Sequence, residues 1–313
     1  MLRILRLFIF LFPLLPSCRQ AAAPAETELD APRLEAISLR GDSLFAPQPS
    51  ARALATYDSL RLRFDSLDVE QWIWLGRWAA YTGEHQEAIR TYTAALERFP
   101  EDARLYRHRG HRYITTRQLD RAISDFLQAA DLIAGKPDEV EPDGMPNARN
   151  IPVSTLHTNV WYHLGLAYYL KNDLSAALEA YEKGLEACEN DDMRVSFWHW
   201  KYMALRQLGQ EEAAQHAVAE VHPDMEVVES FDYWRLCLFY HDAMTLEELQ
   251  AGKPGTTQGS SEALLYGIGN WHFYHHRAEV AETVLRDILR DGNWAAFGYI
   301  AAEAALSRIE SEQ

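Results

Sequence analysis

Several features that would direct a functional assignment are missing from this 313-residue sequence. No convincing alternation of apolar and polar residues indicates a β-strand, which removes most enzyme folds. The chain also lacks a GxSxG nucleophile elbow, a P-loop and a GxGxxG loop after a strand. We therefore expect no catalytic residue and no cofactor.

Positive charge and cysteine are also scarce. Thirty lysines and arginines stand against 46 aspartates and glutamates, which gives a formal net charge of −16. Nucleic-acid binding relies on basic side chains that neutralise phosphates, so the composition argues against a nucleic-acid partner. A disulfide between Cys188 and Cys237 is chemically permitted in an oxidising compartment, but no spacing forces it, and two buried free thiols are the favoured interpretation.

Apolar residues are plentiful, at 48% of the chain, and they recur at a fixed period within residues 69–136. Trp72, Gly76, Ala88, Tyr92 and Ala95 return 34 positions later as Tyr106, Gly110, Ala122, Phe126 and Ala129. Small residues at this spacing suit the close approach of two antiparallel helices, and large ones fill the gaps beside them. One such helical hairpin cannot cover its own apolar face, so the pattern predicts stacked hairpins.

This stretch resembles the tetratricopeptide repeat, from Trp72 and the Leu75–Gly76 pair to Pro100. The period of 34 residues is the period of that family. The resemblance implies an all-α fold, a right-handed tetratricopeptide-repeat superhelix (α-solenoid) of about five to six helical hairpins. It makes residues 69–136 repeats 1 and 2.

Beyond residue 136 the register shifts. Gly165 follows Gly110 by 55 positions rather than 34, so 21 residues are inserted, and the proline-rich segment 137–157 is expected to be a long loop. Residues 158–223 hold repeats 3 and 4. Residues 224–313 read as further repeat-like hairpins with a closing helix, and residues 34–68 as an N-terminal capping segment with a turn at Gly41–Asp42.

The N-terminus has the character of a targeting segment. Residues 1–17 combine two arginines with an apolar run of about ten residues, too short to span a bilayer, and predict a signal peptide. Leu15-Pro16-Ser17-Cys18 resembles the lipobox of bacterial lipoproteins, which makes Cys18 the lipidation site and residues 18–33 a flexible tether. By the same resemblance, Arg19 favours the outer membrane over the inner one. The alternative is a plain secreted protein in which Cys18 is incidental.

The resemblance also implies a binding surface. In this family the first helix of each hairpin lines a concave groove, and the matching positions here are aromatic, basic or amide-bearing. Aromatic and arginine side chains are common anchors of binding surfaces. Some of these side chains can instead point into the core. The candidate binding residues are Trp74, Arg77, Tyr81, Arg107, His108, His111, Tyr162, His163, Tyr169, His199, Trp200, Arg206, Tyr266, Asn270 and Phe273.

Four of these candidates are histidines, and they allow a second interpretation. His108 and His111 share a helix face, and the insertion that follows is acidic, so a metal site of two histidines and a carboxylate is conceivable. No HExxH or other spacing specific to a metal family supports it.

Three functions follow from these observations. The leading hypothesis is a membrane-anchored, non-enzymatic adaptor that holds a peptide or partner protein in its groove. The first alternative is a cell-envelope receptor for a small solute, in which loop 137–157 closes a pocket lined by Arg107, His108 and His111. The second is a metal-dependent enzyme built on the same histidines.

Overall fold

The computed structural model describes residues 32–62, 67–142, 144, 147–251 and 261–311. The chain divides into two units, Met1–Arg33 and Leu34–Gln313, and the description below concerns the second. The predicted signal peptide and the lipidation site Cys18 lie outside the described residues.

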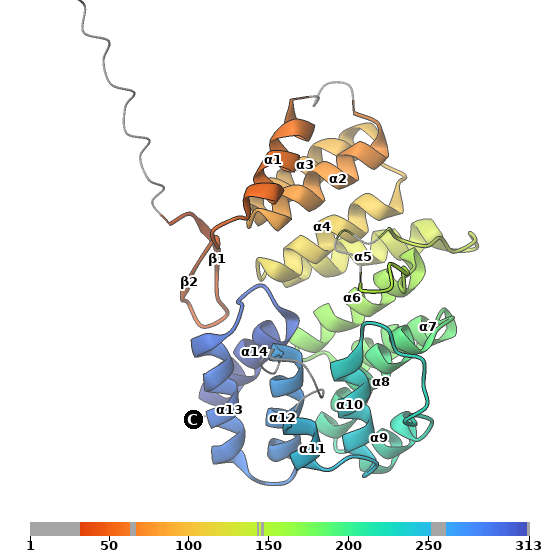
Figure 1. Cartoon of the computed structure of the whole chain (residues 1–313), viewed down its shortest axis with the longest axis vertical. Coiled ribbons are helices and arrows are strands. Elements are labelled where there is room, and N and C mark those ends of the chain that lie inside the picture. Colours follow the sequence, from red (N-terminus) through yellow and green to blue (C-terminus); the bar gives the residue numbers. More distant parts are fainter. Residues whose placement is uncertain (1–31, 63–66, 143, 145–146, 252–260, 312–313) are drawn as a thin grey trace, which may run out of the picture. The chain divides into compact units, whose positions relative to one another are not determined.

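Helical hairpins follow one another along the chain, as the repeat predicts (Figure 1). The all-α tetratricopeptide-repeat solenoid is therefore confirmed. Repeats 1 and 2 comprise α2 (Val69–Tyr81) with α3 (His85–Arg98), and α4 (Ala103–Thr115) with α5 (Leu119–Ile133). The next two hairpins are α6 (Leu156–Leu170) with α7 (Leu174–Glu186), and α8 (Asp191–Gln207) with α9 (Glu211–Val218).

The small residues of the repeat lie where each hairpin is tightest. A Cβ atom placed on Gly76 would come within 2.4 Å of the Tyr92 ring, and one placed on Gly165 within 2.2 Å of the Tyr181 ring. Ala88 and Ala95 are completely buried beside them. The alternation of small and large residues therefore sets the distance between the two helices of a hairpin.

Polar caps fix where the key helices begin. Asp68 and Gln71 form a capping box at the start of α2, and Thr155 and Thr158 form one at the start of α6. The second of these caps ends the 137–157 insertion and restores the repeat, because it satisfies the first backbone N–H groups of α6.

The C-terminal part continues the helical stack and then turns back. The helix α10 (Phe231–Tyr240) and the short helix α11 (Leu246–Gln250) precede the last hairpin, α12 (Glu262–Tyr274) with α13 (Ala278–Asp291). The closing helix α14 (Phe297–Ser311) packs against both helices of that hairpin and also contacts α6. At the other end, α1 (Ala51–Arg61) packs on α2.

A short β-hairpin corrects the expectation of no strands. β1 (Leu34–Ile37) pairs antiparallel with β2 (Ser43–Phe45), and the predicted turn lies between them, with Gly41 at a φ of 91°. Strands of four and three residues with an irregular register are too short to produce a readable alternation. Contacts with segments far away in the sequence hold this hairpin in place, and such contacts produce no periodic pattern in the hairpin's own sequence.

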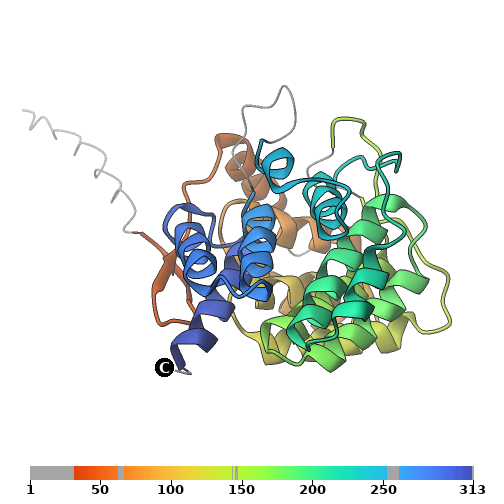
Figure 2. The ribbon, with the colours of Figure 1, turned by 90° about the horizontal axis from the view of Figure 1, so that it is seen from below.

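The hairpin joins the two ends of the solenoid. The Gln86 backbone N–H, at the start of α3, donates to the Glu35 carboxylate at 2.9 Å, and the Trp294 indole N–H donates to the Phe45 carbonyl at 2.8 Å. Figures 1 and 2 both show the orange hairpin beside the blue C-terminal helices.

None of the helices within the described residues is long and apolar enough to cross a membrane.

Candidate functional site

The candidate residues all lie on the first helices of the hairpins, α2, α4, α6, α8 and α12, but they have three different environments. Most are buried among the helices. Trp74, Arg77, Tyr81 and His111 are partly exposed near the N-terminal repeats. Arg206, Asn270 and Phe273 line an open cleft near the C-terminal end.

The buried candidates form an aromatic core with its own hydrogen bonds. The Trp200 indole N–H donates to the Tyr162 hydroxyl at 2.9 Å, and the hydroxyls of Tyr169 and Tyr266 lie 2.9 Å apart. Burial raises the pKa of Tyr162 and Tyr169 well above the usual value for tyrosine. In this arrangement these side chains pack the inner helices together and present little surface to a ligand.

Two of the four histidines, His111 of α4 and His163 of α6, lie beside α14. The rings of His111 and His163 are 4.7 Å apart between centroids, and Phe297 of α14 packs against both, at 5.1 and 5.5 Å. Burial, followed by the nearby arginines, lowers the pKa of His108, His111 and His163 well below 6.5. They are therefore neutral at neutral pH.

The fourth histidine, His199, lies apart from this group. Its ring stacks on Tyr233, with centroids 4.8 Å apart, and its Nδ1 lies 3.2 Å from the Tyr240 hydroxyl. Within the described part of the chain, no three histidine, cysteine or acidic side chains come together as a metal-binding group. The hypothesis of a metal-dependent enzyme therefore finds no site among these residues.

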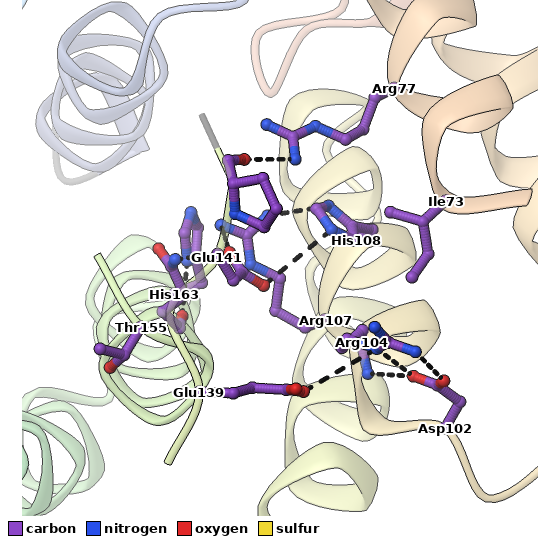
Figure 3. A network of polar contacts seen from close by, with 12 residues as sticks. Ile73, Arg77, Asp102, Arg104, Arg107, His108, Glu139, Glu141, Thr155 and His163 are labelled. Carbon is purple, nitrogen blue, oxygen red and sulfur yellow. Dashed lines mark hydrogen bonds and ion pairs between the residues drawn. The ribbon is translucent and has the colours of Figure 1, made fainter. Parts of the chain in front are cut away.

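The 137–157 insertion, which we call the strap, contacts α4 through its described residues Glu139 and Glu141. Figure 3 shows the Glu141 side chain between Arg107 and His108. Arg107 Nη2 lies 2.9 Å from Glu141 Oε2, and His108 Nε2 lies 4.0 Å from Glu141 Oε1. Glu141 is only 6% exposed, so its carboxylate fills the space beside Arg107 and His108 that the receptor hypothesis assigns to a solute.

The half-exposed residues of α2 meet the same strap. The Arg77 guanidinium lies over the Trp74 ring at 4.4 Å and donates to the Pro142 carbonyl at 2.7 Å. It also lies 3.4 Å from the Tyr81 hydroxyl. These three candidates therefore form one surface that the strap partly covers.

The open cleft has a volume of about 810 Å³. Besides the three candidates, it is lined by Tyr274, which ends α12, and by Arg308 on α14. The Arg206 guanidinium lies 5.4 Å from the Tyr274 ring and pairs with Glu211 at 2.9 Å. Sequence reasoning missed Arg308, because no repeat register extends into the closing helix.

Cys188 and Cys237 are both free and buried, as the sequence favours. Burial raises the pKa of the Cys188 thiol to about 12, and it also raises the pKa of Cys237. Both side chains are therefore unreactive core residues in the folded protein.

Comparison with solved structures finds several proteins of similar fold. A tetratricopeptide repeat protein from Parabacteroides merdae ATCC 43184 shares 16% identity over 82% of this chain and 92% of its own, with a TM-score of 0.49. YrrB, described as a TPR protein with an unusual peptide-binding site, shares 17% over 83% and 100%, with a TM-score of 0.41. MamA (AMB-1) shares 18% over 54% and 87%, with a TM-score of 0.42.

A search of curated proteins finds no match to this sequence. Family models give a direct result, since two models of the tetratricopeptide repeat match residues 72–102 and 158–191. The matched segments cover most of α2 with α3 and most of α6 with α7, which are hairpins with the close glycine-to-tyrosine packing. The chain is a tetratricopeptide-repeat protein.

Proposed function

We propose that the protein is a membrane-anchored adaptor without enzymatic activity, and that it binds a peptide segment of a partner protein in the cleft between α8, α12 and α14. The fold supports a role in protein interaction. The observation that carries the proposal is the open cleft, because it is where candidate groove residues remain available to a ligand.

The chemistry of the cleft suits a peptide. Ile309 is partly exposed and offers apolar surface, and Phe273 is 47% exposed. Among the described residues, Arg308 has no carboxylate partner, and the Asn270 amide contacts only the Met203 sulfur, at 3.4 Å. Apolar contact area beside unused hydrogen-bonding groups is the usual composition of a peptide-binding surface.

Site-specific crosslinking tests this role. A photoreactive amino acid at position 273 of the full-length chain, in its native envelope, is expected to capture a partner segment. The same amino acid at Leu127, which is equally exposed on the outer helix α5, serves as the matched control. A synthetic peptide of the captured segment should bind the purified protein, and Arg206→Glu should weaken it by about tenfold, since a charge is reversed in the cleft.

Two results would count against the proposal. In the first, positions 273 and 127 capture the same proteins, which indicates nonspecific contact. Alternatively, the captured segment binds wild type and Arg206→Glu equally, which places the interaction elsewhere.

The membrane anchor is a separate part of the proposal and rests on Cys18 and the residues before it. A lipid at this cysteine with more than one acyl chain would hold the protein stably at the outer membrane. Cys18→Ala should abolish incorporation of labelled palmitate and move the protein from the membrane to the soluble fraction. Unchanged fractionation of this variant would show that the anchor is not at Cys18.

A solute receptor is the second candidate, because the cleft volume of about 810 Å³ also falls within the range of small-molecule sites. Denaturing the purified protein and analysing what it releases distinguishes the two functions. A receptor purified from its native envelope should release a stoichiometric small molecule detectable by mass spectrometry, whereas an adaptor should release none.

A further inference from the structure

The β-hairpin formed by β1 and β2 has two faces of opposite character. Its inner face, which carries Ala36 and Leu44, is buried. Its outer face carries Leu34, Ile37 and Phe45, whose side chains are 50%, 49% and 44% exposed. Single exposed apolar side chains are normal on a protein surface, but three large ones together mark a surface that contacts something. Figures 1 and 2 both show this hairpin at the outside of the helical stack.

An irregularity in the strand pairing brings the three apolar side chains to one face. The register shifts between Leu34 and Ala36, which leaves Glu35 as an extra residue in β1. In a regular strand, Leu34 and Ile37 would point to opposite faces, because successive side chains alternate. The extra residue places them on the same face, beside Phe45, which is the partner of Leu34 in the register. The bulge therefore produces the apolar outer face.

Contacts with the helices hold this face in a fixed orientation. The Glu35 carboxylate accepts a hydrogen bond from the Gln86 backbone N–H at 2.9 Å, and the Gln86 side-chain amide donates to the Glu35 carbonyl at 2.8 Å. At the C-terminal helix, Arg40 Nη2 lies 3.0 Å from Glu310 Oε1. A two-stranded hairpin is marginally stable by itself in water, so these contacts keep it folded. Whatever meets the outer face is thereby oriented relative to the solenoid.

The charge of the hairpin suits contact with lipid. Segment 33–45 contains Arg33 and Arg40 against Glu35 and Asp42, so its net charge is 2 − 2 = 0, on a protein of net charge −16. Leucine, isoleucine and phenylalanine are side chains that interfacial elements bury at the boundary between headgroups and acyl chains. An uncharged apolar face is where an acidic protein can approach a bilayer with the least electrostatic repulsion.

The predicted lipidation site would keep a membrane within reach of this face. Fifteen residues, 19–33, lie between Cys18 and Leu34, and a chain of that length spans at most roughly 50 Å. The hairpin is also the first element that the structure describes after Cys18. A tether of this reach gives the outer face a high effective concentration at the bilayer, so even a weak apolar contact would be well populated.

We propose that the outer face of the β-hairpin, formed by Leu34, Ile37 and Phe45, rests on the lipid surface to which the chain is anchored. The lipid at Cys18 holds the protein at the membrane, and the hairpin sets the orientation of the solenoid there. This inference rests on the membrane anchor proposed above, and it concerns a surface different from the cleft at Phe273.

Fluorescence quenching by lipid tests the contact. An environment-sensitive fluorescent amino acid replaces Ser43, which is exposed and pairs with Ile37, in the full-length protein from its native envelope. The protein is reconstituted in phosphatidylcholine vesicles that carry a nitroxide quencher near the headgroups. Fluorescence at position 43 should fall about twofold, because such a face lies within the interfacial region of the bilayer. The same amino acid at Leu127, which is similarly exposed on α5, should not be quenched.

Replacing the apolar patch should abolish the quenching. Threonine favours strands but is polar, so the combined variant Leu34→Thr, Ile37→Thr and Phe45→Thr should lower the quenching at position 43 to the level seen at position 127. Leu127→Thr is the matched control and should leave the quenching unchanged. Ile37→Thr alone changes one half-exposed side chain, and it should still reduce the quenching if the triple variant fails to fold.

The anchor and the hairpin contact are measured separately. If the protein does not float with the vesicles, the anchor proposal fails, and coupling Cys18 to a maleimide phospholipid then supplies a tether with which the hairpin is tested by itself. Cys188 and Cys237 are buried, so this coupling is specific. The hairpin proposal fails if tethered protein is not quenched at position 43, or if the threonine variants are quenched like wild type. It also fails if fluorescence at position 43 depends on protein concentration without lipid, because a second copy then covers the face.

Discussion

The Arg117 guanidinium and the Glu303 carboxylate lie 2.6 Å apart, Nη2 to Oε2, although 186 positions separate them in the chain. Arg117 follows α4 and Glu303 lies in the middle of α14, so the pair ties the closing helix to the second repeat. Arg117 also donates to the Trp294 carbonyl at 2.8 Å, and Glu303 accepts from the Leu39 backbone N–H. The N-terminal hairpin, a central repeat and the C-terminal helix thus meet at one buried carboxylate.

Removing that carboxylate should destabilise the protein strongly. Both side chains are almost fully buried, at 3% and 1% exposed, so Glu303→Leu leaves the Arg117 charge buried without compensation. We expect the free energy of unfolding to fall by about 3–5 kcal/mol, measured by urea denaturation. The double variant Arg117→Met with Glu303→Leu should recover most of this loss, because no charge is then left unpaired.

A surface pair provides the comparison. Arg286 and Glu282 lie 3.4 Å apart with side chains 49% and 28% exposed, and Glu282→Gln should change the free energy by less than about 1 kcal/mol. If Glu303→Leu proves equally mild, α14 does not close the solenoid through this pair.

The small residue in each hairpin should be intolerant of even one methyl group. Gly165→Ala places a Cβ within 2.2 Å of the Tyr181 ring, so the helices must separate or the ring must move. We expect a loss of about 1–3 kcal/mol in unfolding free energy. Tyr181→Leu should offset part of that loss, and the combined variant should be more stable than the sum of the two single effects predicts. Additive effects would mean that the two residues do not set the helix separation.

Local spacing explains why so much of the fold could be predicted. Gly76 and Tyr92 belong to the same hairpin, so their packing leaves a period in the sequence that can be read directly. The fold-back of α14 and the docking of the strap depend on Glu303 and Glu141, whose partners lie far away in sequence and follow no period. The sequence alone does not distinguish a buried, paired glutamate from an exposed one.

For the candidate site, the sequence could predict which helices carry the residues but not which side chains are covered. Repeat register placed the fifteen residues on the inner helices, but it carries no information about what covers those helices. Tyr266 and Trp200 are buried because α10, α12 and α14 pack over the later repeats, whereas Phe273 stays exposed near the end of α12. Arg308 escaped notice because no repeat register extends into α14, and its place in the cleft is seen only in the packed chain.

The two core cysteines should resist alkylation in the native state. Burial raises the pKa of the Cys188 thiol to about 12, so almost no thiolate is present at pH 8. In a Cys18→Ser background, we expect native protein to react with neither iodoacetamide nor a disulfide reagent, and denatured protein to react at both cysteines. A native disulfide would instead give no reaction after denaturation without reductant.

Acid should destabilise the protein through its buried histidines, most clearly through His199. Burial lowers the pKa of His199 to about 3, from 6.5 in the unfolded chain. Between these values the unfolded state binds the extra proton, so stability is complete above pH 6.5 and falls as the pH drops toward 3. One such group contributes a slope of about 1.4 kcal/mol per pH unit.

The variant His199→Gln tests this contribution. Its glutamine keeps a polar partner for Tyr240 but cannot take up the proton. The slope of its unfolding free energy between pH 6 and 4 should therefore be smaller than that of wild type by about 1.4 kcal/mol per pH unit. The exposed His216→Gln should retain the wild-type slope. Parallel slopes for all three proteins would mean that His199 is already accessible to protons in the folded state.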